Sequence, residues 1–256
     1  METVTSKDGT TIAFDRVGSG PPVVFVCGAS VARGSNAQLA ELLATDLTVF
    51  NIDRRGRGDS TDTPPYAIER EVEDIAAVIE AAGGSASVWG SSSGGALALI
   101  AADRGLPISR LALWEPPFVP KGFPKPPSDQ VEQYETMIAE GRRGDAVEYF
   151  MTKVVGMPAE FAAQARSQPW WGATEAIAHT LSYDARIMRS MDDPAPLAAP
   201  VLAPTLVVAG TIVPWMSVAA TALADALPNG EVRILEGQSH DVDPNLLAPV
   251  LNEFFA

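Results

Sequence analysis

Short runs of apolar residues alternate with longer stretches of mixed polarity through the first half of the chain. The clearest run is VVFV at 23–26, four apolar positions in succession. A strand that is apolar at consecutive positions is typical of the centre of a parallel sheet, where both faces are buried. The runs predict strands over 11–17, 23–27, 48–52, 86–89 and 111–114.

Helical periodicity fills the stretches between these strands. We expect helices over 36–44 and 68–82, the second of which ends at Gly83 and Gly84. The pattern returns near the end of the chain, with strands over 205–208 and 231–235 and helices over 217–227 and 246–255. Strands that alternate with helices in this way predict an α/β fold with a mostly parallel sheet between helical layers.

The middle of the chain has a different pattern, with helical periodicity and no strand. Four helices are expected there, over 129–140, 145–155, 159–168 and 174–188. Proline-rich segments border this region on both sides. The sequence therefore predicts a core domain in two parts, 1–117 and 204–256, with a helical cap inserted at 118–203.

The amino-acid composition indicates a globular protein and limits its possible binding partners. A chain of 256 residues, 46% hydrophobic and 20% charged, can bury a large core without disulfide or metal staples. Acidic residues outnumber basic ones by 32 to 18, which gives a net charge of −14 and disfavours nucleic acid or an anionic membrane as a partner. No apolar stretch approaches the ~18 residues of a membrane span. With one cysteine and no leader-like start, we expect a cytoplasmic protein, monomeric or homodimeric.

A Gly-x-Ser-x-Gly motif at 90–94 carries the strongest chemical signal. It follows a predicted strand directly and precedes a helical stretch, the context in which this motif forms a sharp turn that presents its serine. Glycine is needed on both sides because neighbouring backbone leaves no room for a Cβ. The motif predicts Ser92 as a nucleophile.

A serine hydroxyl needs a base, and histidine is the usual one near neutral pH. The chain has two histidines. His240 follows the last predicted strand, where a loop at the carboxyl edge of the sheet can reach Ser92, so we assign it as the base. His179 lies within a predicted cap helix, and we expect a packed or partly exposed helical residue there, with a role in a substrate pocket as the alternative.

These features together resemble the α/β-hydrolase superfamily over nearly the whole chain. The segment 53–60 (DRRGRGDS) is similar to a D-x-R-G-x-G-x-S turn that many members carry after a strand. The resemblance implies a structural turn whose arginines have no chemical role. It also implies two backbone N–H donors for a developing oxyanion, those of Ala29 and Ser93.

The triad acid departs from the common family pattern, because Val213 stands where an aspartate is expected. Glu115, at the end of the strand that follows the nucleophile helix, can supply the carboxylate instead. This is similar to some haloalkane dehalogenases and to zearalenone-type lactone hydrolases, and the latter share an elbow like that at 89–94. The alternative is that Glu115 only begins a turn, while Asp241 and Asp243 are expected as loop or helix-cap residues.

Large apolar side chains are dense in the cap and the entrance loops. We expect five of them to line a pocket for an apolar small-molecule substrate: Trp170, Trp171, Trp215, Met157 and Phe161. The cap has no basic cluster for a phosphate or a CoA tail, and no spaced His, Asp and Glu set indicates a metal. We therefore expect no cofactor, and Cys27 is expected as an inert core thiol.

The predicted function is hydrolysis of a carboxylic ester or lactone through an acyl-enzyme on Ser92. Other chemistry on the same triad is the alternative, namely C–C bond hydrolysis, perhydrolysis or a polyketide-type cyclisation. A ligand receptor of the same fold with slow turnover is a further alternative, for which the missing aspartate at Val213 is the argument.

Overall fold

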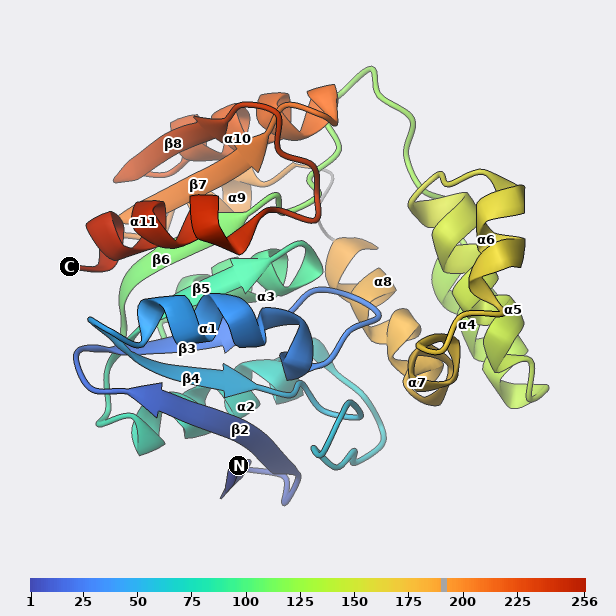
Figure 1. Cartoon of the computed structure of the whole chain (residues 1–256), viewed down its shortest axis with the longest axis horizontal. Helices are drawn as coiled ribbons and strands as arrows, with labels where there is room; N and C mark the ends of the chain where they lie inside the picture. Colours follow the sequence, from blue (N-terminus) through green and yellow to red (C-terminus); the bar gives the residue numbers. More distant parts are fainter. Residues whose placement is uncertain (190–192) are drawn as a thin grey trace.

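A twisted sheet forms the centre of the molecule in the computed structural model, which describes residues 1–189 and 193–256 (Figure 1). Within this part of the chain the sheet has eight strands in the order β1-β2-β4-β3-β5-β6-β7-β8. The strands are β1 (Glu2–Thr5), β2 (Thr11–Gly18), β3 (Pro22–Val26), β4 (Thr48–Ile52), β5 (Ala86–Ser91), β6 (Ile108–Trp114), β7 (Thr205–Gly210) and β8 (Gly230–Leu235). All neighbouring strands from β4 to β8 run parallel, and β2 pairs antiparallel with β1 and β4. The predicted mostly parallel α/β sheet is confirmed.

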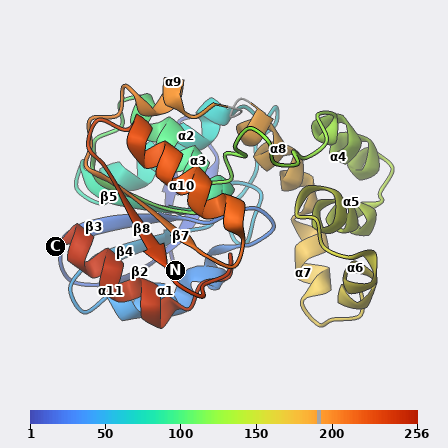
Figure 2. The same cartoon turned by 90° about the horizontal axis from the view of Figure 1, so that it is seen from above.

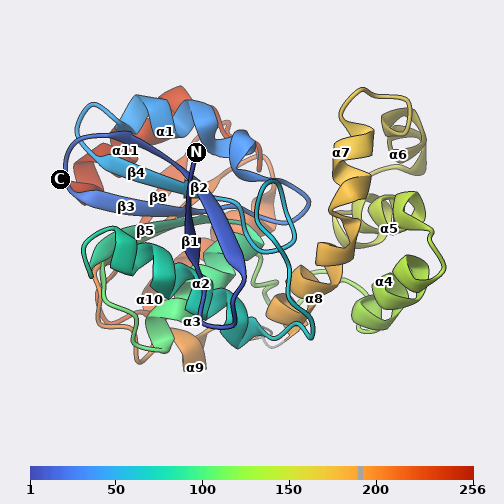
Figure 3. The ribbon, with the colours of Figure 1, turned by 90° about the horizontal axis from the view of Figure 1, so that it is seen from below.

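Helices cover both faces of this sheet (Figure 3). One face carries α1 (Ala37–Leu43) and α11 (Pro244–Phe255), and the other carries α2 (Ile68–Ala81), α3 (Ser93–Asp103) and α10 (Pro214–Ala226). The residues of β3 from Val23 to Val26 are completely buried, as expected of a central strand covered on both sides. The carboxyl ends of the parallel strands therefore lie on one side of the sheet, called its carboxyl edge here, where the loops that follow the strands come together.

Four helices form a separate layer beyond the carboxyl ends of the strands (Figures 1 and 2). They are α4 (Gln130–Ala139), α5 (Arg143–Tyr149), α6 (Ala159–Ala165) and α7 (Trp171–Ala176), and a π-helical turn at Phe150–Val154 continues α5. The short helix η3 (Ala178–Thr180) and then α8 (Leu181–Arg189) lead back to the sheet. The layer has a hydrophobic core of its own, built around Tyr134, Val147 and Trp171.

The segment predicted as the cap, 118–203, is broader than this separate layer. Phe118, Ile187 and Ala198 pack into the main core with the sheet, and Ala198 ends the short helix α9 (Ala195–Ala198). Residues 190–192 of the predicted range lie outside the described residues. The helix expected over 174–188 is divided into α7, η3 and α8, and the N-terminal strand β1 was not predicted.

Candidate active site

Ser92 lies in a sharp turn between β5 and α3. Its backbone has φ 53° and ψ −128°, a conformation that a residue with a side chain rarely adopts. Its N–H donates to the carbonyl of Trp114 on the neighbouring strand at 2.8 Å. The turn therefore holds the half-buried Ser92 at the carboxyl edge of the sheet, as the motif predicts.

The two glycines of the motif lie where a side chain has no room. A Cβ on Gly90 would lie 2.6 Å from the carbonyl oxygen of Gly94. A Cβ on Gly94 would overlap the carbonyl oxygens of Val26 and Cys27, at the end of β3. The serine turn thus packs backbone against backbone with the loop after β3, which explains both glycines.

Glu115 directly follows β6, and its carboxylate is fully buried. Oε1 accepts a hydrogen bond from the Gly210 N–H at 2.9 Å, and Oε2 lies 2.6 Å from His240 Nδ1. Ser91 and Trp114 are register partners, so Ser92 and Glu115 leave adjacent strands at the same level. The structure therefore places the three predicted residues Ser92, Glu115 and His240 at one edge of the sheet.

His240 lies in the loop between β8 and α11, with 43% of its side chain exposed. Its carbonyl accepts a hydrogen bond from the Trp114 indole at 2.9 Å, so Trp114 contacts the serine turn through its backbone and the histidine loop through its side chain. Sequence reasoning did not single out Trp114. Among the described residues, no hydrogen bond joins the Ser92 hydroxyl to the imidazole of His240.

The loop after β3 approaches Ser92 from the other side. A Cβ on Gly28 would lie 2.9 Å from Ser92 Cβ, so only a glycine permits this approach. In the described part of the chain, the N–H groups of Ala29 and Ser93 donate to no protein acceptor. Two unpaired donors beside the serine are what binding of an oxyanion requires.

Three other residues near the predicted triad positions, Val213, Asp243 and Cys27, have structural surroundings. Val213 precedes α10 as its N-cap, and Asp243 caps α11 by accepting from the Asn245 N–H at 2.9 Å. Cys27 is buried, and burial raises the pKa of its thiol. A neutral buried thiol is a poor nucleophile.

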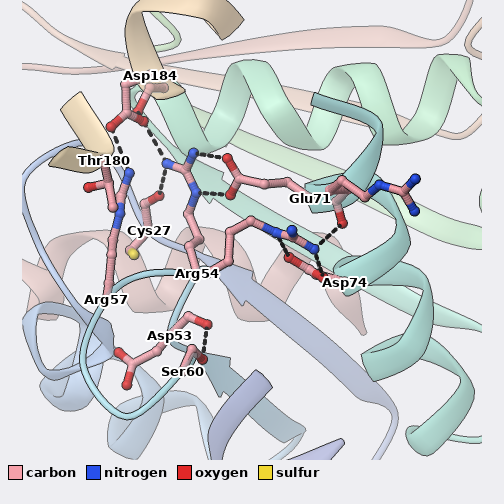
Figure 4. A network of polar contacts seen from close by, with 12 residues as sticks. Cys27, Asp53, Arg54, Arg57, Ser60, Glu71, Asp74, Thr180 and Asp184 are labelled. Atoms are coloured by element: carbon pink, nitrogen blue, oxygen red, sulfur yellow. Dashed lines mark hydrogen bonds and ion pairs between the residues drawn. The ribbon is translucent and has the colours of Figure 1, made fainter. Parts of the chain in front are cut away.

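A buried ionic network, drawn in Figure 4, contacts Gly28 and Ser93 next to this site. Asp184 of α8 accepts hydrogen bonds from Arg54 at 2.7 Å and from Arg57 at 2.6 Å, and Glu71 of α2 binds Arg54 through both carboxylate oxygens. Burial alone would raise the pKa of Asp184. The positive charges of Arg54 and Arg57 have the larger combined effect and hold this pKa below its usual value. The three arginines of the turn at 53–60 are therefore buried, and each forms an ion pair with a carboxylate.

His179 lies in η3, between the cap and the core. Its Nδ1 is 3.0 Å from a guanidinium nitrogen of Arg143 on α5, and its Nε2 is 3.5 Å from Asp62 of the core. Asp62 also accepts a hydrogen bond from Tyr183 of α8 at 2.6 Å. His179 thus contacts both parts of the molecule, and it is a partly exposed helical residue as expected.

Four of the five residues predicted to line a substrate pocket belong to the cap, as the sequence indicates. Trp171 is buried in the core of the cap, where Arg166 lies over its ring. Trp170, Phe161 and Met157 are exposed, and the first two border a hollow of about 220 Å³ on α6 and α7. A role of these four side chains in a substrate pocket stays a prediction. Trp215 differs, because it is half-buried at the start of α10, at the carboxyl edge of the sheet.

Residues 1–189 and 193–256 contain no group of three or more His, Cys, Asp or Glu side chains placed to hold a metal. In the same residues, no helix combines the length and apolar composition that crossing a membrane requires.

Several proteins of known structure share this fold. An alpha/beta hydrolase from Sphaerobacter thermophilus is 52% identical, with a TM-score of 0.94 and full coverage of both chains. A thermophilic esterase from Thermogutta terrifontis is 23% identical, with a TM-score of 0.76 over 98% of this chain and 96% of that one. A meta-cleavage product hydrolase from Pseudomonas fluorescens is 19% identical, with a TM-score of 0.70 over 100% and 97%. The model of the alpha/beta hydrolase family matches residues 23–250, and the chain belongs to that family.

Proposed function

We propose that this protein is a serine hydrolase that cleaves a carboxylic ester or lactone of an apolar small molecule. The observation that carries the proposal is the 2.6 Å contact between His240 Nδ1 and the buried Glu115 carboxylate, one strand away from Ser92. A carboxylate on Nδ1 fixes the imidazole tautomer that leaves Nε2 free to accept a proton. A histidine oriented in this way is the base that a serine nucleophile needs.

The proposed reaction begins when Ser92 Oγ attacks the substrate carbonyl and His240 Nε2 takes the hydroxyl proton. The C–O bond to the leaving group then breaks, and His240 returns the proton to the leaving oxygen. Water attacks the resulting acyl-enzyme through the same two proton transfers and releases the acid. Throughout, Glu115 stabilises the imidazolium through the Nδ1 hydrogen bond.

The negative charge that develops on the carbonyl oxygen is bound by the N–H groups of Ala29 and Ser93. Both groups are unpaired in the described structure, and the Gly28 backbone lies against Ser92. Donors that are already in place cost no reorganisation when the charge develops, and each is worth about 10²–10³-fold in rate.

Two features support an apolar substrate. Trp215 is half-buried in the first turn of α10, the helix that follows β7 at the carboxyl end of the sheet, where Ser92 also lies. The arginines nearest the site, Arg54 and Arg57, are paired with carboxylates and are not free to bind an anionic group. We therefore assign the binding energy of the acyl or ring portion to apolar contact.

A direct test combines labelling with turnover. A fluorophosphonate should form an adduct on Ser92, found by peptide mass spectrometry, and Ser92→Ala should abolish hydrolysis of p-nitrophenyl butyrate. Ser91→Ala is the matched control and should keep both labelling and turnover, because Ser91 is the last residue of β5. An adduct on Ser91, Ser93 or Cys27, or turnover by Ser92→Ala, would contradict the proposal.

A substrate panel separates ester hydrolysis from other chemistry on the same residues. It should contain esters of rising acyl length, simple lactones and an activated diketone whose cleavage breaks a C–C bond. The proposal expects the highest kcat/KM on an ester or lactone. A preference for the diketone would assign the site to C–C bond hydrolysis instead.

A further inference from the structure

The buried carboxylate of Asp184 connects two peptide units that border Ser92. Asp184 comes from α8, the helix that returns the chain from the cap, and it is only 5% exposed. Its hydrogen bonds to Ser93, Arg54 and Arg57 use both oxygens. A buried carboxylate with three donors is held in one position, so it can fix the groups it binds.

The first connection runs through Ser93. The Ser93 hydroxyl donates to Asp184 Oδ1 at 2.7 Å, while its backbone N–H points to no protein acceptor among the described residues. The side chain therefore anchors the residue from the side of α8, and the N–H stays available beside Ser92.

The second connection runs through Arg57. Its guanidinium donates to Asp184 with one terminal nitrogen and to the carbonyl oxygen of Gly28 with the other. The Gly28 carbonyl and the Ala29 N–H belong to one planar peptide unit. A cation on the carbonyl of that unit fixes its plane and polarises it, which makes the Ala29 N–H a stronger donor.

The rest of the network keeps Arg57 and Asp184 in place (Figure 4). Arg54 binds Asp184 on one side and the Glu71 carboxylate on the other, with both Glu71 contacts at 2.7 Å. A remaining hydrogen bond from Arg54 reaches the carbonyl of Cys27 at 3.3 Å, one peptide before Gly28. Two arginines thus face two carboxylates, and the buried charges balance.

We propose that Arg57 and Asp184 are positioning residues that hold and polarise the two peptide units whose N–H groups bind the oxyanion. The proposal rests on the proposed function, because it assigns these residues to the same transition state. It places α8, the helix that returns the chain from the cap, in contact with Ser93 of the oxyanion site. Neither residue touches the substrate.

The expected signature is a loss of transition-state binding with little loss of substrate binding. Removal of one oxyanion donor costs about 10²–10³-fold in kcat, and a weakened donor should cost less than that. We expect Arg57→Gln to lower kcat by about 10–100-fold and to leave KM nearly unchanged. The affinity for an alkylboronic acid, which forms a tetrahedral adduct on the serine, should fall in parallel with kcat/KM.

Arg55 provides a matched control in the same turn. Its guanidinium is buried, pairs with Asp74 through two contacts of 2.7 Å and also binds Asp8. No hydrogen bond that the structure shows joins Arg55 to the loop after β3 or to the serine turn. Arg55→Gln should therefore lower the melting temperature as much as Arg57→Gln does, while its kcat and boronate affinity stay at the wild-type values.

Ser93→Ala keeps the test decisive if Arg57→Gln does not fold. This variant removes only the hydroxyl bound to Asp184 and leaves the backbone N–H present, so we expect about a 10-fold lower kcat with matching loss of boronate affinity. A kcat within twofold of wild type in both variants, or a kcat loss without loss of boronate affinity, would overturn the proposal.

The outcomes also separate this inference from the proposed function. If wild type hydrolyses esters through Ser92 but both variants keep full kcat, only the inference fails. If wild type neither reacts with the fluorophosphonate nor turns over any ester, lactone or diketone, the proposed function fails and the inference fails with it.

Discussion

Glu115 adopts a backbone conformation that glutamate rarely occupies, with φ 42°. Such a residue persists only when its surroundings determine it, and here both carboxylate oxygens are used, by the Gly210 N–H and by His240. A Cβ on Gly210 would overlap the Gln238 carbonyl oxygen, so the loops after β7 and β8 meet closely beside the acid. These contacts favour the proposed role, in which the Glu115 carboxylate orients His240.

The assignment predicts a severe effect of Glu115→Gln. The amide keeps the shape of the side chain but removes the charge that stabilises the imidazolium, and comparable changes in other triads cost about 10⁴-fold in kcat. Steady-state kinetics with p-nitrophenyl butyrate should show that loss, while circular dichroism shows an intact fold. Val213→Asp in the same background should restore part of the rate, because it supplies a carboxylate from the loop after β7. Activity of Glu115→Gln within a few fold of wild type would refute the assignment.

Sequence reasoning assigned Ser92, His240 and Glu115 because each follows a strand that the hydrophobic pattern locates. Asp184 and Trp114 were out of its reach for a physical reason. Asp184 is 91 residues from Ser93 in the sequence, and nothing local to α8 marks a carboxylate that will be buried in the core. Trp114 looks like an ordinary strand residue until the sheet order places its indole against the His240 loop.

At the scale of elements, the backbone of the turn between β5 and α3 packs closely against the backbone at the end of β3. The predicted strands at the centre of the sheet agree well with the observed ones because continuous apolar runs report burial on both faces. The single helix expected over 174–188 did not form as such, because the chain turns at Ile177 between the cap layer and α8. Periodicity alone does not mark that turn, since η3 and α8 continue the helical pattern of polarity.

The packing of the serine turn predicts a large effect for Gly94→Ala. The added methyl would overlap the carbonyl oxygens of Val26 and Cys27, neither of which can move without disturbing β3. We expect destabilisation by about 1–3 kcal/mol, measured by urea unfolding, together with loss of activity. Gly172→Ala is the control, because a Cβ there meets nothing within 4 Å, and alanine in α7 should be neutral or slightly stabilising. Equal stability of the two variants would show that the turn tolerates a side chain.

At the scale of the whole molecule, carboxylates join the cap to the core through α8. Asp184 binds the arginines of the core, and Asp62 of the core binds Tyr183 of the same helix. Tyr183 also stacks on Tyr66 with ring centroids 3.8 Å apart. The cap therefore depends on ionised groups as well as on apolar packing for its attachment, and its attachment should depend on pH.

Asp62 gives the clearest pH prediction. Burial alone would raise the pKa of Asp62. The hydrogen bonds from His179 and Tyr183 have the larger combined effect, so the pKa of Asp62 is lower than its usual value of 3.8. A carboxyl whose pKa is lower in the folded state stabilises the fold fully above its unfolded pKa and loses that contribution as the pH falls through the folded value. The stability advantage of wild type over Asp62→Asn should therefore be constant near neutral pH and shrink below about pH 4.

For Asp74 the opposite pH dependence is expected, because its pKa is raised. Burial raises its pKa, and the pairing with Arg55 only partly offsets the effect. The folded state then binds its proton more readily than the unfolded state does, so the stability of wild type relative to Asp74→Asn should increase as the pH falls toward about 4. Urea unfolding of both variants and wild type between about pH 4 and 7, extended for Asp62→Asn to lower pH, measures the two slopes. Because every variant is compared with wild type at the same pH, the relief of repulsion within a chain of net charge −14 largely cancels. Parallel slopes for Asp62→Asn and Asp74→Asn would contradict the opposite roles that burial and hydrogen bonding give to these two carboxylates.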